Sequence, residues 1–182
     1  MLDVDGSEMS SFSIISIRVP KKVIDKAGEL GLDLESILYE AILRELRLDP
    51  SEEAELRLEL ARKHLDEAKA YVEKGDAIQT SEKLYKAVEE CIMVLAHQLN
   101  VPEAARAREY GRWFAWLLDK AVRRIARILN EYRVKSVWDA AYSLHVWGFH
   151  EAKLDIDDIE TDIPQIEWLR DYTKKVVEKV ND

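Results

Sequence analysis

The stretch Lys74-Gly75-Asp76-Ala77-Ile78-Gln79 separates two long amphipathic patterns and decides how the core is built. Residues 49–74 before it and residues 77–99 after it repeat apolar side chains every three or four positions, which is typical of helices with one buried face. These positions are Leu58, Ala61, Leu65, Ala68 and Val72, and then Leu84, Tyr85, Val88, Ile92, Leu95 and Leu99. Because Gly75 can end one helix and Asp76 can cap the next, the link is short and we expect an antiparallel hairpin.

Helical patterns continue on both sides of this hairpin. At its start, Asp49-Pro50-Ser51-Glu52 combines a capping aspartate, a proline at the first helical position and a glutamate that can bond back to the cap. Further helices are predicted over residues 103–109, 112–130, 134–150 and 156–180, the last one kinked or divided by Pro164. The expected fold is therefore mostly α, with an antiparallel bundle of four or five helices over residues 49–182.

The first 48 residues predict a smaller module that precedes the bundle. It comprises a flexible tail over residues 1–11, a strand over residues 12–19 ended by Pro20, and helices over residues 21–30 and 34–46, with Gly31 as a stop and Asp33 as a cap. A lone strand leaves its backbone groups without partners, so the same strand of a second copy is the simplest partner. The strand-helix-helix module over residues 12–48 therefore predicts a homodimer formed through residues 12–19.

This order of elements and the run Ile15-Ser-Ile-Arg-Val-Pro-Lys-Lys-Val23 resemble the ribbon-helix-helix fold of dimeric repressors. The resemblance implies paired strands in the major groove of DNA, with Ile14, Ser16 and Arg18 directed toward the bases. Between residues 12 and 47, however, six basic residues balance six acidic ones, so the module is neutral. Two interpretations stay open: the module only dimerises, or it also contacts nucleic acid through Ser16 and Arg18.

Length, charge and cysteine content bound the class of protein. The 182 residues carry a net charge of -9, which argues against broad binding to nucleic acid, and a 35% share of charged residues that suits a thermophile. No run approaches the roughly 18 apolar residues that cross a bilayer, and the acidic first residues are unlike a secretory signal. Cys91 has no partner for an internal disulfide. We expect a cytoplasmic protein without membrane contact and without a cofactor.

The most distinctive stretch is Trp138-Asp-Ala-Ala-Tyr-Ser-Leu-His-Val-Trp-Gly-Phe-His-Glu151, which holds two of the five tryptophans and two of the four histidines. On a regular helix Trp138, Ala141, His145 and Gly148 share one stripe, and the two small residues allow another helix to approach closely. We therefore expect His145 to be a core residue whose ring nitrogens are satisfied by its neighbours. Such packing could by itself explain the stretch.

The two histidines of this stretch do not predict a metal site. His145 and His150 are five positions apart, about 140° around an α-helix, whereas a chelating pair usually stands four apart on one face. Glu151 adds a further type of ligand without adding geometry. Gly148 could relax the helix locally, so a metal site stays open as the less favoured alternative, and His150 is the more accessible of the two histidines.

Three segments resemble the signature segments of the PaREP family of archaeal proteins: Ser81-Glu-Lys-Leu-Tyr-Lys-Ala-Val-Glu-Glu90, Gly111-Arg-Trp113, and Trp138 to Glu151. The resemblance spans about residues 12–180 and implies no particular activity. The helical domain is similar in turn to the HEPN class of bundles, which includes nucleotide-binding partners of nucleotidyltransferases and ribonuclease toxins. The ribonucleases of that class place an arginine four to six residues before a histidine. No histidine of this sequence has such an arginine, so that activity is disfavoured.

A pocket between helices could hold a planar anionic ligand through an aromatic ring and a cation. The candidates for stacking are Trp113, Trp147 and Tyr85, and those near the anionic group are Lys83, Lys86, Arg112 and His150, with Glu151 beside them. Three functions stay open: a dimeric, non-catalytic module that binds a nucleotide or nucleic acid, a scaffold for protein partners such as a toxin-antitoxin-like regulator, and an enzyme acting on RNA or phosphate. The first is favoured, since no nucleophile or phosphate-loop motif supports the third.

Overall fold

The computed structural model describes residues 15–30, 32 and 34–181, and every regular element within them is a helix. In chain order these are α1 (Lys21–Glu29), α2 (Leu34–Leu46), α3 (Pro50–Glu73), α4 (Ala77–Gln98), α5 (Pro102–Tyr110), α6 (Ala115–Leu129), α7 (Arg133–Ser143), the π-helix η1 (Leu144–His150), α8 (Ile156–Glu160) and α9 (Ile163–Asn181). The chain divides within α2, between Tyr39 and Glu40, into two compact units. Across the described residues, no helix combines the length and the apolar character that spanning a bilayer requires.

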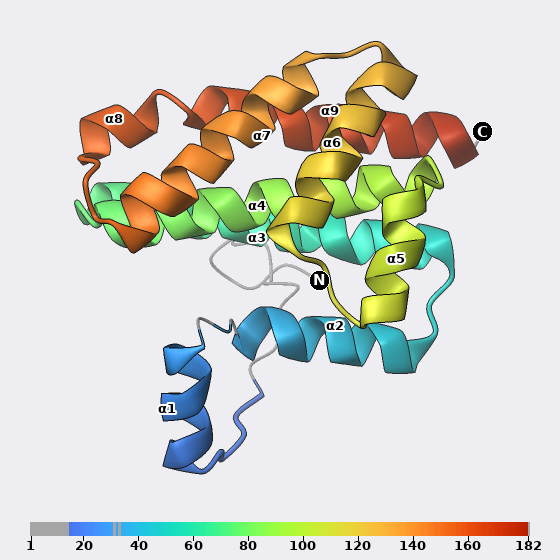
Figure 1. The fold of residues 1–182 in the computed structure, drawn as a ribbon. Coiled ribbons are helices and arrows are strands. Elements are labelled where there is room, and N and C mark those ends of the chain that lie inside the picture. The colour runs from blue at the N-terminus through green and yellow to red at the C-terminus, as the bar shows by residue number, and fades with distance from the viewer. Residues whose placement is uncertain (1–14, 31, 33, 182) are drawn as a thin grey trace, which may run out of the picture. The chain divides into compact units, whose positions relative to one another are not determined.

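The antiparallel hairpin predicted at the glycine link is confirmed by α3 and α4. At the start of α3 the carboxylate of Asp49 accepts a hydrogen bond from the amide of Glu52, whose own carboxylate accepts one from the amide of Asp49, both at 3.0 Å. At the start of α4 the carboxylate of Asp76 accepts from the amide of Gln79 at 3.0 Å. Gly75 has a φ of 69°, which glycine adopts without steric cost. The two helices consequently lie side by side (Figure 1).

α4 is the central helix of the second unit, and the predicted helical bundle forms around it. It packs against α3 and also contacts α5, α6, α7, η1, α8 and α9 (Figure 1). Its fully buried side chains include Leu84, Ala87, Val88, Ile92, Leu95 and Ala96. Fully burying a leucine or isoleucine contributes about 1.5 to 3 kcal/mol, so these side chains supply much of the apolar stabilisation of the bundle.

The helix predicted over residues 134–150 divides into the regular α7 and the π-helix η1. Where η1 ends, the amide of Glu151 donates to the carbonyl oxygen of Val146, five residues back, at 3.0 Å. A Cβ atom at Gly148 would lie only 2.0 Å from Oγ and 2.6 Å from Cβ of Ser81 on α4. Glycine is therefore what allows η1 to pack this closely against α4.

The last predicted helix is divided at Pro164, one of the two outcomes expected there. α8 ends at Glu160 and α9 begins at Ile163, so Pro164 lies in the first turn of α9. The missing N–H of a proline needs no partner in a first turn, and its fixed φ suits the start of a helix.

The strand predicted over residues 12–19 is wrong, and with it the strand-helix-helix module. Residues 15–19 are not in a strand, while residues 1–14, which include the predicted tail, lie outside the described residues, as do Gly31 and Asp33. A strand needs a neighbouring strand to receive its backbone hydrogen bonds, and the described part of the chain provides none. The two helices of the predicted module are present as α1 and α2.

Candidate ligand-binding pocket

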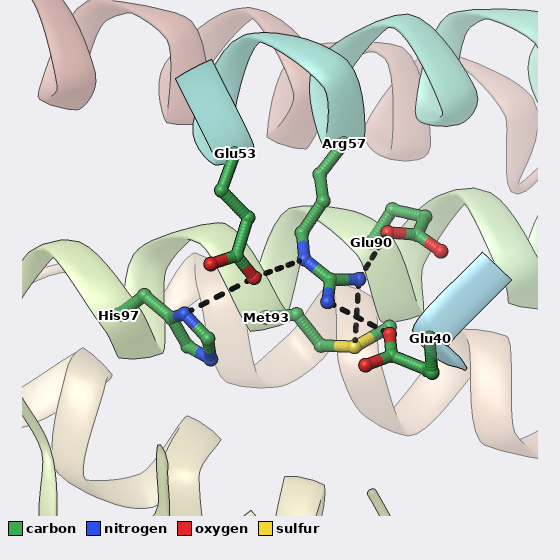
Figure 2. A network of polar contacts seen from close by, with 6 residues as sticks. All are labelled: Glu40, Glu53, Arg57, Glu90, Met93 and His97. Atoms are coloured by element: carbon green, nitrogen blue, oxygen red, sulfur yellow. Dashed lines mark hydrogen bonds and ion pairs between the residues drawn. The ribbon is translucent and has the colours of Figure 1, made fainter. Parts of the chain in front are cut away.

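A buried arginine joins three helices of the second unit. Arg57 on α3 is 2% exposed. Its guanidinium forms ion pairs with Glu40 of α2 at 2.7 Å, with Glu53 of α3 at 3.0 Å and with Glu90 of α4 at 3.0 Å (Figure 2). Its Nη1 also lies 3.4 Å from Sδ of Met93. Each nitrogen of the guanidinium therefore has at least one partner, as the dashed lines in Figure 2 mark.

Burial and mutual attraction set the charges in this network. Burial alone lowers the pKa of Arg57, but the carboxylates of Glu90, Glu40 and Glu53 outweigh it and hold that pKa above its ordinary value. Burial raises the pKa of Glu90, Arg57 opposes the rise, and the neighbouring carboxylates of Glu40 and Glu53 add to it. The pKa of Glu53 falls to about 2, mainly through its hydrogen bond with His97 and in spite of burial. Arg57 and Glu53 are therefore both charged at neutral pH.

His97 connects this network to an aromatic side chain. Its Nδ1 lies 3.4 Å from Oε1 of Glu53, and its ring centroid lies 6.0 Å from that of Trp113. Nε2 of His97 is buried and has no hydrogen-bond partner among the described residues. A buried ring nitrogen without a protein partner is a group that a bound ligand or a water can satisfy.

These side chains form one wall of a pocket of about 360 Å³, a size suited to a small ligand. The lining residues are Glu40, Leu43, Arg44, Arg47, Leu48, Glu53, Arg57, His97, Ala107, Arg108, Gly111, Arg112 and Trp113. Gly111 ends α5 with a φ of 69°, and a Cβ atom there would lie 3.4 Å from Nη1 of Arg44. The positive φ favours glycine at this position, and the guanidinium of Arg44 lies beside the turn.

Positive charge dominates the lining, and we call this site the arginine pocket. It brings five arginines together with two glutamates, in a chain whose net charge is -9. Arg57 is neutralised by its carboxylates, but the other four form no ion pair with any described residue: Arg44, Arg47, Arg108 and Arg112. Arg112 instead places its guanidinium carbon 4.2 Å from the ring centroid of Phe114. Most of the cationic charge of the pocket is therefore free to meet an anion.

A second cluster, made of rings, lies where η1 packs on α4. His145 stacks on Tyr85 with centroids 4.1 Å apart, and its Nε2 lies 3.1 Å from Nε2 of His150. Nδ1 of His145 is buried without a hydrogen-bond partner among the described residues. Burial, with a smaller effect of His150, lowers the pKa of His145 to about 4, and burial also raises the pKa of Tyr85. The prediction of a core histidine with satisfied nitrogens is wrong, since His145 is half-buried and held by ring packing.

The predicted site residues fall in two places instead of one. The arginine pocket holds Arg112 and Trp113, whereas η1 and the residue after it hold Trp147, His150 and Glu151, all three exposed. His97 marks the first place and Tyr85 the second, and these residues are twelve positions apart on α4, about 18 Å along the helix. A single small ligand cannot contact both.

The remaining candidates lie outside the arginine pocket. Nζ of Lys83 lies 2.8 Å from Glu67 and Nζ of Lys86 lies 3.5 Å from Glu82, so a ligand would have to displace carboxylates from both. The nucleic-acid candidates Ser16 and Arg18 are exposed in a segment without regular structure. A contact between these two residues and DNA stays a prediction.

Four residues that shape the pocket were not singled out from the sequence: Arg44, Arg47, His97 and Arg108. They lie up to 64 positions apart in the sequence, and only tertiary packing brings them together. One sequence signal could have identified them as candidates: each stands near the end of a predicted helix, where a basic side chain can reach a neighbouring segment. That signal is weak because helix ends commonly carry basic residues.

The second unit is an all-helical bundle with a cationic pocket beside its central hairpin. Residues 56–170 match the Archaeal PaREP1/PaREP8 family, and because this is more than half of the chain, the protein belongs to that family. The chain is also similar to a protein from Sulfolobus solfataricus of known crystal structure, at 30% identity and a TM-score of 0.59, over 64% of this chain and 95% of that one. No curated protein matches.

Proposed function

We propose that this protein binds an anionic ligand with a planar ring, such as a nucleotide, in the arginine pocket, and that it does so without catalysis. The observation that carries this function is the group of four arginines that line the pocket without an ion pair to any described residue. A guanidinium presents a fork of N–H donors that matches the oxygens of phosphate or carboxylate. Phosphate is the favoured group, because several arginines can share its charge.

The ring of the ligand is assigned to the side of the pocket formed by Trp113 and His97. Trp113 is half-buried, and aromatic side chains that stack on a base contribute about 1 to 3 kcal/mol. Nε2 of His97, buried without a protein partner, can exchange a hydrogen bond with a ring nitrogen or a hydroxyl. A nucleotide would thus be held by charge at one end and by stacking at the other.

Nucleotide binding agrees with what the resemblance to the HEPN class implies, because that class includes nucleotide-binding partners of nucleotidyltransferases. A HEPN-type ribonuclease is a poorer fit, since none of the four histidines follows an arginine at the required spacing. The described residues that line the arginine pocket include cations and one histidine but no serine, threonine or cysteine nucleophile. We therefore favour binding over turnover.

Isothermal titration calorimetry with ATP, AMP, inorganic phosphate and adenosine tests this function. We expect affinity to fall from ATP through AMP to phosphate, with adenosine weak because it lacks the anion. Hydrogen bonds to charged groups contribute about 1.5 to 3 kcal/mol, so Arg44→Ala and Arg112→Ala should each weaken ATP binding by about tenfold or more. The matched control Arg62→Ala removes an exposed arginine of α3 that pairs with Asp66 on the surface, and it should leave binding unchanged.

Equal ATP affinities of Arg112→Ala, Arg62→Ala and the unaltered protein would contradict the assignment of the site. A complete absence of binding by all four compounds would contradict the function itself and favour the scaffold alternative, in which the protein acts through a protein partner.

The first unit favours a second role, self-association. Among its described residues only Ala27 is buried, and large apolar side chains are exposed at Ile15, Ile17, Val19, Val23, Ile24, Leu30, Leu34, Ile37 and Leu38. So small a unit buries little apolar surface by itself, and exposed apolar residues gathered in this way mark an interaction surface. A second copy of the chain is the proposed partner, because a two-fold axis lets the same apolar residues cover each other.

Size-exclusion chromatography with light scattering checks this association. We expect twice the chain mass of 21.1 kDa, reduced to the single mass by Ile17→Asp combined with Ile24→Asp. Lys22→Asp, which changes an exposed charge in the same unit, is the control and should stay dimeric. A single-chain mass at every concentration would contradict the homodimer.

A further inference from the structure

The π-helix brings together two histidines that an α-helix would separate. In an α-helix, residues five apart point about 140° away from each other. The hydrogen bonds of a π-helix span five residues, so that His145 and His150 follow one another on the same face of η1. Their Nε2 atoms lie 3.1 Å apart and their ring planes are inclined at 79°. The geometric objection to a chelating pair, which assumed α-helical spacing, does not apply to η1.

The separation of the two Nε2 atoms suits a shared metal ion. Zinc–histidine bonds measure about 2.0 to 2.1 Å, so two such nitrogens at an angle of about 90° to 110° lie about 2.9 to 3.4 Å apart. The observed 3.1 Å falls within that interval. The same distance also fits a direct hydrogen bond between the two rings, so the two arrangements must be separated by experiment.

Ring packing holds the pair in place. His145 is stacked on Tyr85 of α4, at 4.1 Å between centroids, and lies 6.0 Å from the ring of Phe149. Phe149 in turn lies 5.0 Å from the ring of His150. His150 is exposed, so the pair opens toward solvent. Ligands that are already oriented lose little conformational freedom when they bind an ion.

We propose that His145 and His150 form a binding site for a divalent transition-metal ion of the group Cu²⁺, Ni²⁺ and Zn²⁺. Imidazole suits these ions, whereas Mg²⁺ and Ca²⁺ prefer oxygen ligands. Within the described residues no group of three or more His, Cys, Asp or Glu side chains could hold a metal. Water completes the coordination shell, and Cu²⁺, which forms the most stable complexes of the three, binds most tightly.

This site is independent of the arginine pocket. Tyr85, on which His145 stacks, is about 18 Å along α4 from His97 of the pocket. The loss of one site should therefore leave the other intact, and the metal site stands or falls separately from nucleotide binding.

Titration of the full chain, without a polyhistidine tag, with Cu²⁺ tests this site. Trp147 is exposed and stands two residues from His145, so bound Cu²⁺ should quench tryptophan emission with a stoichiometry of one ion per chain. The electron paramagnetic resonance spectrum of the complex should show coupling to two nitrogens. Ni²⁺ and Zn²⁺ should compete with Cu²⁺, and Mg²⁺ should not.

His150→Ala and His145→Gln should each weaken Cu²⁺ binding by at least about tenfold, since even the loss of a group that only supports a metal ligand costs that much. His97→Gln changes a histidine of the arginine pocket and serves as the control, which should bind Cu²⁺ as the unaltered protein does. Since His150 is exposed, its variant is expected to fold, and circular dichroism confirms this.

A Cu²⁺ affinity unchanged by both His145→Gln and His150→Ala would overturn the site. So would a failure of the unaltered protein to bind Cu²⁺, which would mean that the two rings only share a hydrogen bond.

Discussion

The two halves of α4 contact the neighbouring helices through different kinds of interaction. Toward its C-terminal end, Glu90 and His97 belong to a network of charges around the buried Arg57. In its N-terminal half, Ser81 faces a glycine of η1 and Tyr85 stacks on a histidine. A buried charge needs an oppositely charged partner, whereas packed rings and small side chains need surfaces of complementary shape. The two halves are therefore expected to respond to different changes, and each also leaves a group for a ligand.

The largest loss of stability is expected when the charge network around Arg57 is broken. Arg57→Ala leaves the carboxylates of Glu40, Glu53 and Glu90 without their shared cation, and removing one partner of a buried ion pair costs about 3 to 5 kcal/mol. Chemical denaturation followed by circular dichroism measures the loss. As control, Arg62→Ala removes a surface arginine and should stay within about 0.5 kcal/mol of the unaltered protein. Equal stabilities of these two variants would show that the buried network stabilises the fold no more than a surface arginine does.

A smaller loss of stability is expected when the close packing of η1 on α4 is disturbed. In Gly148→Ala the new methyl group would collide with Ser81, and overpacking of this kind costs about 1 to 3 kcal/mol or more. The second change Ser81→Gly removes the colliding atoms and should restore part of the loss, which a double-mutant cycle by thermal unfolding detects. Gly28→Ala is the control, because a Cβ atom there meets nothing within 4 Å. No difference between the two alanine variants would refute the close packing of η1 on α4.

The smallest effect is a pH dependence that belongs to the ring side of α4. The folded protein holds the pKa of His145 at about 4, whereas the unfolded chain has the ordinary value of about 6.5. Between these values the unfolded chain binds a proton that the folded protein does not, so stability should fall as the pH drops from about 6.5 to about 4. Thermal unfolding in a buffer with a chelator should show this fall, and His145→Phe should reduce it. If the stability of His145→Phe falls with pH as much as that of the unaltered protein, other groups cause the pH dependence.

Much of the bundle could be predicted from the sequence because its signals are local. The caps at Asp49 and Asp76, the link at Gly75 and the break at Pro164 each act within one turn of the chain, and the structure shows all four. Apolar spacing likewise identified the face of α4 that is buried.

The site was harder to predict because it depends on packing between distant segments. Arg112 and Trp113 could be singled out by type, but only the fold places them near Arg44 and His97. The π-helix was missed because five-residue hydrogen bonding leaves no periodicity in seven residues, and His145 was consequently placed on an α-helical stripe. The strand was wrong because β-branched residues indicate only a local preference, and the described residues provide no neighbouring strand to pair with it.

The most direct test of the central claim is a crystal structure of the protein grown with ATP. Nucleotide binding in the arginine pocket predicts phosphate oxygens within hydrogen-bond distance of Arg44 and Arg112, and a base against Trp113. A nucleotide bound elsewhere, with these arginines still facing solvent, would contradict the claim.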